Sequence, residues 1–330
     1  MQSADVDDRR LVDLFALDLI DGVRSETFDR VARIASLTFD VPVALVTMLD
    51  DDDQYFCGVY GTDLTGNRRA ESFCNHTVRL DDVLVVPDAT LDPRFRDLAV
   101  VTGPPHVRFY AGAPVSTPGG AHIGTLCILD VAPRDLDARQ RGVLRDLADL
   151  VEIEIGHHGR ALTDPLTQLA NRRAFMAAAD RFVALGRRRN EPVSLVFADL
   201  NGLKRVNDEF GHIVGDSLIQ RAASCIDHAM RRADLAARIG GDEFAVLLLG
   251  TDAAGASQAI ATIQDRIVED NRIDRARPAP GRGPVGTCEL SIAFGSATVA
   301  PDESIDTFVS RADSAMYDAK RADAARHCTA

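Results

Sequence analysis

The stretch RIGGDEFAVLL, residues 238–248, places two glycines and two acidic residues between two strand-like runs. Glycine and aspartate are ordinary turn residues, and the apolar run FAVLL is typical of a buried strand. The stretch is therefore predicted to form a β-hairpin with Gly240 and Gly241 at its tip. Two adjacent glycines remove two Cβ atoms and permit positive φ, so a ligand can lie against bare backbone there.

Outward from this hairpin, the second half of the chain alternates helices and strands. Helical periodicity predicts helices over about 171–187, 213–232, 253–270 and 304–322, with a shorter helix ahead of the second. Apolar runs predict four strands: VSLVFADL (193–200), LAARI (235–239), FAVLLL (244–249) and LSIAFGSA (290–297). After the leading helix, this order is that of a split βαβ, ferredoxin-like domain.

The first half has a different pattern. Apolar residues at helical spacing predict two amphipathic helices before residue 40. VPVALVTMLD (41–50) pairs with QYFCGVYG (54–61), and RFYAGAPVS (108–116) pairs with HIGTLCILD (122–130), as two hairpins. We expect a helix-flanked antiparallel sheet, so the whole chain is of the α+β class.

The two halves are joined by a predicted helix over 135–155. Its apolar residues repeat at three-four spacing, which fits either a short coiled coil or a terminal helix packed on its own domain. Asp164-Pro165 marks the start of the next domain, because proline disfavours helix at the residue before it. We therefore divide the chain into residues 1–158 and 159–330.

Composition narrows the classes of function. The net charge of −13 argues against nucleic-acid binding. No apolar run reaches the roughly 18 residues of a membrane span, and the N-terminus lacks a secretory pattern, so we expect a cytoplasmic protein with no membrane partner. The six cysteines form no C-x-x-C pair and are expected to be reduced and packed. Cys74 and His76 alone are weak metal ligands.

The hairpin carries candidate chemistry. Asp242 and Glu243 lie at its tip, and Asp199 ends the strand expected beside it. Adjacent carboxylates repel, and a divalent cation relieves the repulsion. Mg²⁺ combines a few carboxylates with phosphate oxygens, which points to a nucleoside triphosphate. An acidic turn with no ligand is the alternative for these residues taken by themselves.

DLNGLKRVNDEFGHIVGD (199–216) favours the nucleotide. Lys204 suits a phosphate, and Asn207 offers both a hydrogen-bond donor and an acceptor. Asp216 is an acceptor suited to the N1–H and N2–H edge of guanine.

The first half resembles the GAF sensor domains of bacterial signalling proteins over about residues 10–155. The similarity lies in FCNHTV (73–78), VVPDATLDPRF (85–95), RFYAGAPV and GTLCILD (124–130). The resemblance implies a cup-shaped small-molecule site above the sheet, with a ligand that the sequence does not identify. His106, Arg108 and Tyr110 lie near this expected pocket, but surface or core roles suit them equally.

The second half resembles the GGDEF domain of diguanylate cyclases over about residues 160–325. DPLTQLANRR (164–173) and ADSAMYDAK (312–320) carry the resemblance together with the hairpin. It implies that two GTP molecules condense to cyclic di-GMP and two pyrophosphates. Each active half-site would hold two Mg²⁺ ions, with Mn²⁺ as an alternative, and two domains would face each other in a homodimer.

The resemblance also assigns residues. The metal ligands would be Asp199, Asp242 and the Leu200 carbonyl. Gly240 and Gly241 would face the nucleotide, Asn207 and Asp216 the guanine, and Lys204 and Lys320 the phosphates. Asp242 or Glu243 would accept the ribose 3′-hydroxyl proton, and Asp242 is favoured.

A second site is implied by RRAD (231–234). In the family, an R-x-x-D ahead of the signature binds the product and inhibits turnover, which here assigns Arg231 and Asp234, with Arg238 beside them. The alternative is that the arginines stabilise a helix C-terminus. The family's arginine after the final lysine is missing, since residue 324 is alanine.

We therefore expect a diguanylate cyclase regulated by its GAF domain and by product feedback. The alternative is an inactive receptor that binds GTP or cyclic di-GMP and signals through a partner.

Overall fold

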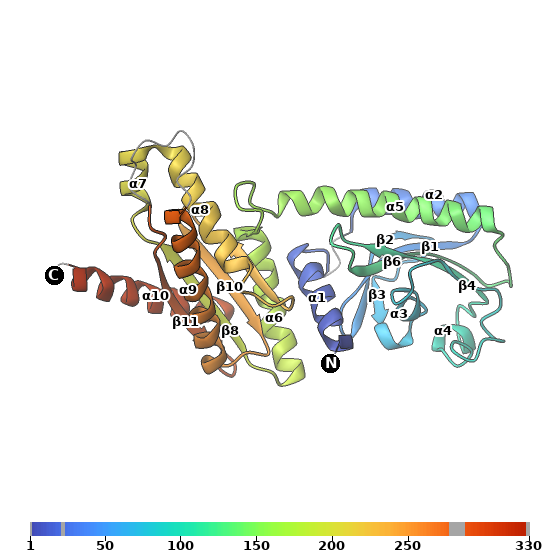
Figure 1. Cartoon of the computed structure of the whole chain (residues 1–330). Coiled ribbons are helices and arrows are strands. Elements are labelled where there is room, and N and C mark those ends of the chain that lie inside the picture. Colours follow the sequence, from blue (N-terminus) through green and yellow to red (C-terminus); the bar gives the residue numbers. More distant parts are fainter. Residues whose placement is uncertain (1, 21–23, 277–287, 328–330) are drawn as a thin grey trace. The chain divides into compact units, whose positions relative to one another are not determined.

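The structure is a computed structural model that describes residues 2–20, 24–276 and 288–327. The chain divides into two compact units, Met1–Ala161 and Leu162–Ala330. Each unit is a β-sheet with helices packed on it (Figure 1). Among the described helices, none has the length and the apolar run that crossing a membrane requires.

The first unit is built on a six-stranded sheet of order β3-β2-β1-β6-β5-β4, and all of its paired strands are antiparallel. The strands are β1 (Val43–Leu49), β2 (Asp53–Tyr60), β3 (Gly66–Arg68), β4 (Leu84–Val86), β5 (Phe109–Ser116) and β6 (His122–Asp130). The two predicted hairpins, β1 with β2 and β5 with β6, are confirmed.

Helices cover one face of this sheet. Of the three long helices α1 (Gln2–Ala16), α2 (Glu26–Phe39) and α5 (Ala138–Ala161), α2 and α5 pack side by side on it (Figure 1). Helix α2 starts where the Ser25 hydroxyl accepts a hydrogen bond from the Phe28 N–H, and it ends at Asp40, whose φ is 50°. The two predicted opening helices are confirmed.

The opposite face of the sheet carries short elements. These are η1 (Arg69–Glu71), α3 (Cys74–Thr77) and α4 (Ala99–Thr102). An apolar cluster lies beneath them, and it includes Leu45, Phe56, Phe73 and Tyr110. Elements of three or four residues show no periodicity, so the sequence did not predict them, nor the short strands β3 and β4.

The second unit contains a five-stranded sheet of order β11-β8-β10-β9-β7. Its strands are β7 (Ala170–Asn171), β8 (Val193–Leu200), β9 (Asp234–Arg238), β10 (Glu243–Leu249) and β11 (Ile292–Thr298). Its helices are α6 (Arg172–Arg189), α7 (Leu203–Phe210), α8 (His212–Asp227), α9 (Ala253–Ala276) and α10 (Ile305–His327). The predicted ferredoxin-like arrangement is confirmed, because the four predicted strands are antiparallel neighbours in the order expected of it.

Helices cover both faces of this sheet, so all eight residues of β8 are buried. Helices α8 and α9 pack on the face that presents Val196, Ala198 and Phe244. Helices α6 and α10 pack on the other face. There a Cβ at Gly295 would lie 1.9 Å from the backbone nitrogen of Met316, so α10 approaches β11 more closely than any side chain permits.

Strand β7 was not predicted. It has two residues and pairs in parallel with β9, at the edge of the sheet. It follows the Asp164-Pro165 turn, in which the Asp164 carboxylate accepts hydrogen bonds from the N–H and the hydroxyl of Thr167. The opening motif of this unit is thus fixed beside the strand that leads into the hairpin.

Candidate active site

The predicted hairpin joins β9 and β10, and its tip is held by backbone and side-chain hydrogen bonds. The N–H groups of Ile239 and Gly240 donate to the Glu243 carbonyl at 3.0 and 3.3 Å. The Arg238 guanidinium donates to the carbonyls of Gly240 and Gly241 at 3.2 and 2.8 Å. The tip is therefore a braced turn whose backbone direction is set from within the unit.

The two glycines serve different purposes, and neither adopts positive φ. The positive φ that glycine permits is therefore not used at this turn. A Cβ on Gly240 would lie 2.4 Å from Oε2 of Glu243, so a side chain there would displace that carboxylate. A Cβ on Gly241 would meet no atom within 4 Å. Gly241 thus leaves open space at the tip, while Gly240 makes room for the acid.

Three predicted acidic residues meet at the ends of neighbouring strands. Asp199 on β8 and Glu243 on β10 are directly opposed partners in the antiparallel pairing, so their side chains share one face of the sheet. The Leu200 N–H donates to the Asp242 carbonyl at 2.9 Å, which ties the hairpin tip to the end of β8. Asp199 is only 6% exposed. The fold brings together the residues assigned to the metal and to proton transfer.

This grouping of acids disfavours full ionisation. Burial raises the pKa of Asp199, the contact with Lys320 lowers it, and the charges of Asp242 and Asp313 raise it further. Burial also raises the pKa of Glu243, and the charges of Asp199, Asp242 and Asp313 add to this increase. A divalent cation placed among these carboxylates would remove the repulsion that raises both pKa values.

Asp313 was missed by the sequence reasoning. It lies on α10, and its charge raises the pKa values of Asp199 and Glu243. The signal was present in the spacing, because Asp313 precedes Lys320 by two helical turns and so shares its helix face.

Lys320 lies against a carboxylate. Its Nζ is 2.5 Å from Oδ1 of Asp199, whereas the sequence assigned it to phosphate. A cation thus already occupies a position beside the most buried acid of the group. Within the described residues no group of three His, Cys, Asp or Glu side chains is placed to hold a metal ion by itself. The carboxylates of Asp199 and Asp242 are oxygen ligands of the kind that Mg²⁺ combines with phosphate oxygens and water.

The residues assigned to the nucleotide base and phosphates lie on α7 and α8. Lys204 and Asp216 are exposed, and Asn207 is half-buried. The Asn207 side chain rests against Gly215, where a Cβ would lie 1.9 Å from its Oδ1. Within the described part of the chain, the side chains of Asn207 and Asp216 have no hydrogen-bond partner, so both are available to a ligand.

Arg231 and Asp234 form a tight turn ahead of β9. The Arg231 N–H donates to the Asp234 carboxylate at 2.9 Å, and the Asp234 N–H donates to the Arg231 carbonyl at 3.1 Å. Asp234 is 9% exposed, whereas the Arg231 side chain is exposed. The turn holds the carboxylate, and the exposed Arg231 side chain can reach a ligand.

Arg238 lies apart from this pair, at the other end of β9. Strand geometry separates the Cα atoms of Asp234 and Arg238 by roughly 13 Å. The Arg238 guanidinium donates to both carboxylate oxygens of Asp164, at 3.2 and 3.3 Å, and only 15% of its side chain is exposed. Arg238 therefore joins the DPLT turn to the hairpin tip and is already occupied as a hydrogen-bond donor.

The fold and the acidic strand ends define a domain of the nucleotide-cyclase type. Residues 161–326 match the family model described as "Diguanylate cyclase, GGDEF domain", and the chain belongs to this family. Residues 24–155 match the GAF domain model. The predicted order of a GAF domain followed by a GGDEF domain is confirmed.

Curated relatives match parts of the chain. A Pseudomonas aeruginosa protein named as a cyclic di-GMP phosphodiesterase is 37% identical over 194 residues, which are 58% of this chain and 32% of that protein. The diguanylate cyclase DgcP of Escherichia coli is 27% identical over 227 residues, 64% of each chain. This chain spans less than two thirds of the length of either relative.

A solved structure also matches. It is that of the coiled coil and GGDEF domain of DgcB from Caulobacter crescentus in complex with c-di-GMP. The two are 29% identical, the match covers 57% of this chain and 96% of that one, and the TM-score is 0.47.

Proposed function

We propose that this chain is a diguanylate cyclase that condenses two GTP molecules into cyclic di-GMP and releases two pyrophosphates. The observation that carries the proposal is the opposed pair Asp199 and Glu243 at the ends of β8 and β10, beside the open backbone of Gly241. Membership of the GGDEF family and relatives named diguanylate cyclase support it.

In this proposal the carboxylates have two roles, which are metal binding and proton acceptance. Asp199 and Asp242 hold the metal together with the Leu200 carbonyl, and Mg²⁺ or Mn²⁺ supplies charge stabilisation at the attacking and leaving oxygens. Glu243 accepts the 3′-hydroxyl proton. Asp242 is the other candidate for that role. Burial and the neighbouring charges raise the pKa of Glu243, and a raised pKa suits a carboxylate that accepts a proton near neutral pH.

The remaining residues bind and orient GTP. Asp216 accepts hydrogen bonds from the guanine N1–H and N2–H, and Asn207 completes that edge. Lys204 and Lys320 contact phosphates, so Lys320 exchanges its Asp199 partner for phosphate when the nucleotide arrives. Orientation of this kind is the main contribution of a protein to phosphoryl transfer.

A second copy of the chain completes the reaction. In this proposal the β9–β10 hairpin and the residues assigned to guanine form one GTP half-site in each second unit. Two half-sites must face each other for one 3′-oxygen to reach the other α-phosphorus. We propose a homodimer in which helix α5 transmits the state of the first unit. The proposal fails if removing residues 1–155 changes neither the rate nor the oligomeric state.

Product feedback completes the proposal. The Arg231 guanidinium, free on the surface of its turn, binds phosphate and guanine of cyclic di-GMP, and Asp234 accompanies it. Arg238 does not take part while it is bound to Asp164. A cytoplasmic location, where GTP is supplied, stays a prediction.

Incubation of the full chain with GTP and Mg²⁺, followed by chromatography of the products, tests the proposal. We expect cyclic di-GMP from the natural chain and none from Asp242→Asn. Asp208→Asn, an exposed acid on α7 outside the site, is the matched control and should retain activity. Binding of GTP without any turnover would support the alternative of an inactive receptor.

A further inference from the structure

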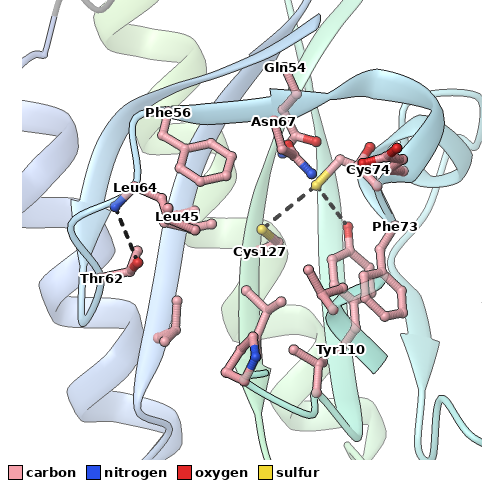
Figure 2. Close-up of a pocket in the computed structure, with 17 residues that line it drawn as sticks. Leu45, Gln54, Phe56, Thr62, Leu64, Asn67, Phe73, Cys74, Tyr110 and Cys127 are labelled. Atoms are coloured by element: carbon pink, nitrogen blue, oxygen red, sulfur yellow. Dashed lines mark hydrogen bonds between the residues drawn. The ribbon is translucent and has the colours of Figure 1, made fainter. Parts of the chain in front are cut away.

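The first unit contains a cavity of about 140 Å³ between its sheet and the segment that carries α3 (Figure 2). Most of its wall is apolar or aromatic, and Leu45, Phe56, Phe73, Tyr110 and Leu129 contribute. The rings of Phe73 and Tyr110 are stacked with centroids 4.8 Å apart. An apolar cavity of about 150 Å³ accepts a benzene ring, so this one has room for a small planar molecule.

Two amide oxygens face this cavity without partners. Oε1 of Gln54 and Oδ1 of Asn67 are buried, and among the described residues neither accepts a hydrogen bond. The Gln54 residue is 3% exposed. Because Gln54 on β2 and Asn67 on β3 are opposed partners in the strand pairing, the two amides lie next to each other (Figure 2).

The tyrosine hydroxyl and the two thiols of the cavity wall lie against partners within the protein. The Tyr110 hydroxyl pairs with Oγ1 of Thr77 at 2.7 Å, and Sγ of Cys74 lies 3.8 Å from Sγ of Cys127. An unsatisfied buried acceptor costs roughly 1–3 kcal/mol, and two side by side invite one group that donates to both. A ligand that satisfies both acceptors must therefore carry N–H or O–H donors at one end and be apolar elsewhere.

The charges of the lining residues limit the charge that the ligand can carry. The residues that line the cavity include the carboxylate of Glu71 and, among those described, no lysine, arginine or histidine. A phosphate or carboxylate would meet acceptors and a negative charge, with no cation to bind it. Aromatic faces favour a cation instead. His106 and Arg108, named from the sequence, are not among the lining residues, whereas Tyr110 is.

We propose that this cavity binds a small planar molecule with an apolar ring and adjacent N–H donors, uncharged or cationic, and that it excludes anions such as nucleotides. The amidine or amino edge of the ligand donates to Oε1 of Gln54 and Oδ1 of Asn67, while its ring packs on Phe56, Phe73 and Tyr110. The inference concerns the first unit alone and does not depend on the proposed cyclase activity.

Three compounds with one ring and different head groups test the proposal. Benzamidine is a cationic donor, benzamide is neutral with one donor group, and benzoate is an anion without donors. Saturation-transfer NMR on the full chain should show benzamidine binding most tightly, benzamide more weakly, and benzoate not at all at the same concentration. Equal or tighter binding of benzoate, or no binding by any of the three, overturns the proposal.

Substitutions at Asn67 test whether benzamidine binds in this cavity. Asn67→Leu keeps the side-chain volume and removes an acceptor, so benzamidine should bind roughly tenfold more weakly. Asn67→Asp keeps the shape and adds charge, so benzamidine should bind several-fold more tightly, about threefold to tenfold. Arg68→Gln is the control, because Arg68 is exposed on the same strand and does not line the cavity. Benzamidine binding that is unchanged in both Asn67 variants arises elsewhere, for example at the acidic strand ends, and contradicts the proposal.

Discussion

Replacing Asp234 by asparagine should stabilise the second unit, and by an amount that depends on pH. Asp234 is 9% exposed, and burial raises the pKa of its carboxyl group from 3.8 to about 6, against the opposing effects of the Arg231 N–H and charge. An acid with a raised pKa in the folded state resists ionisation there. Its contribution to stability is greatest below pH 3.8 and is lost as the pH rises through 6.

The magnitude follows from the shift. About two pKa units correspond to roughly 3 kcal/mol at pH 8, where the carboxyl group is ionised in both states, and to roughly half of that at pH 5. Asparagine keeps an oxygen that can accept from the Arg231 N–H and carries no charge. For a unit of this size, the gain at pH 8 corresponds to a rise in melting temperature of about 6–12 °C.

Thermal unfolding followed by circular dichroism at pH 5 and pH 8 measures this effect. The difference in melting temperature between the natural chain and Asp234→Asn should be larger at pH 8 than at pH 5. Asp227→Asn, an exposed acid at the end of α8, is the control and should change stability by less than about 0.5 kcal/mol. The reasoning is refuted if Asp234→Asn melts no higher than the natural chain at pH 8, or if its gain is larger at pH 5.

Three further predictions concern the hairpin. Gly240→Ala should cost roughly 1–3 kcal/mol of stability in thermal melts and most of the cyclase activity, because its Cβ displaces the Glu243 carboxylate, whereas Gly241→Ala should melt like the natural chain. Glu243→Gln should raise the melting temperature at pH 8 without metal while abolishing product formation, since ionisation of this acid with its raised pKa opposes folding. Arg238→Gln, which loses the pair with Asp164, should cost roughly 2 kcal/mol in denaturant titrations; an unchanged midpoint would contradict the bracing role.

Much of the fold was predictable because its main elements are long and strongly patterned. Strand β8 is buried along its whole length, and the sequence run VSLVFADL gave its bounds. The elements that were missed are two to four residues long, such as β7 and α3, and they depend on tertiary pairing that no local pattern carries.

The site was predictable only where its residues lie on strands whose order the sequence indicated. The opposition of Asp199 and Glu243 follows from strand order, which the sequence indicated. The position of Arg238 does not, because its partner Asp164 is 74 residues away in sequence. The sequence pattern could not predict the conformation of Gly240 and Gly241, because glycine suits both positive φ and a close approach of other atoms. In the structure, Gly240 allows the close approach of Glu243, Gly241 leaves open space, and neither has positive φ.

The most direct test of the central claim is a phosphorus NMR time course of GTP with Mg²⁺ and the full chain. Synthesis of cyclic di-GMP predicts two pyrophosphates for each cyclic product, and no signal change with Asp199→Asn. Release of orthophosphate and GDP, or full activity in Asp199→Asn, would contradict the account.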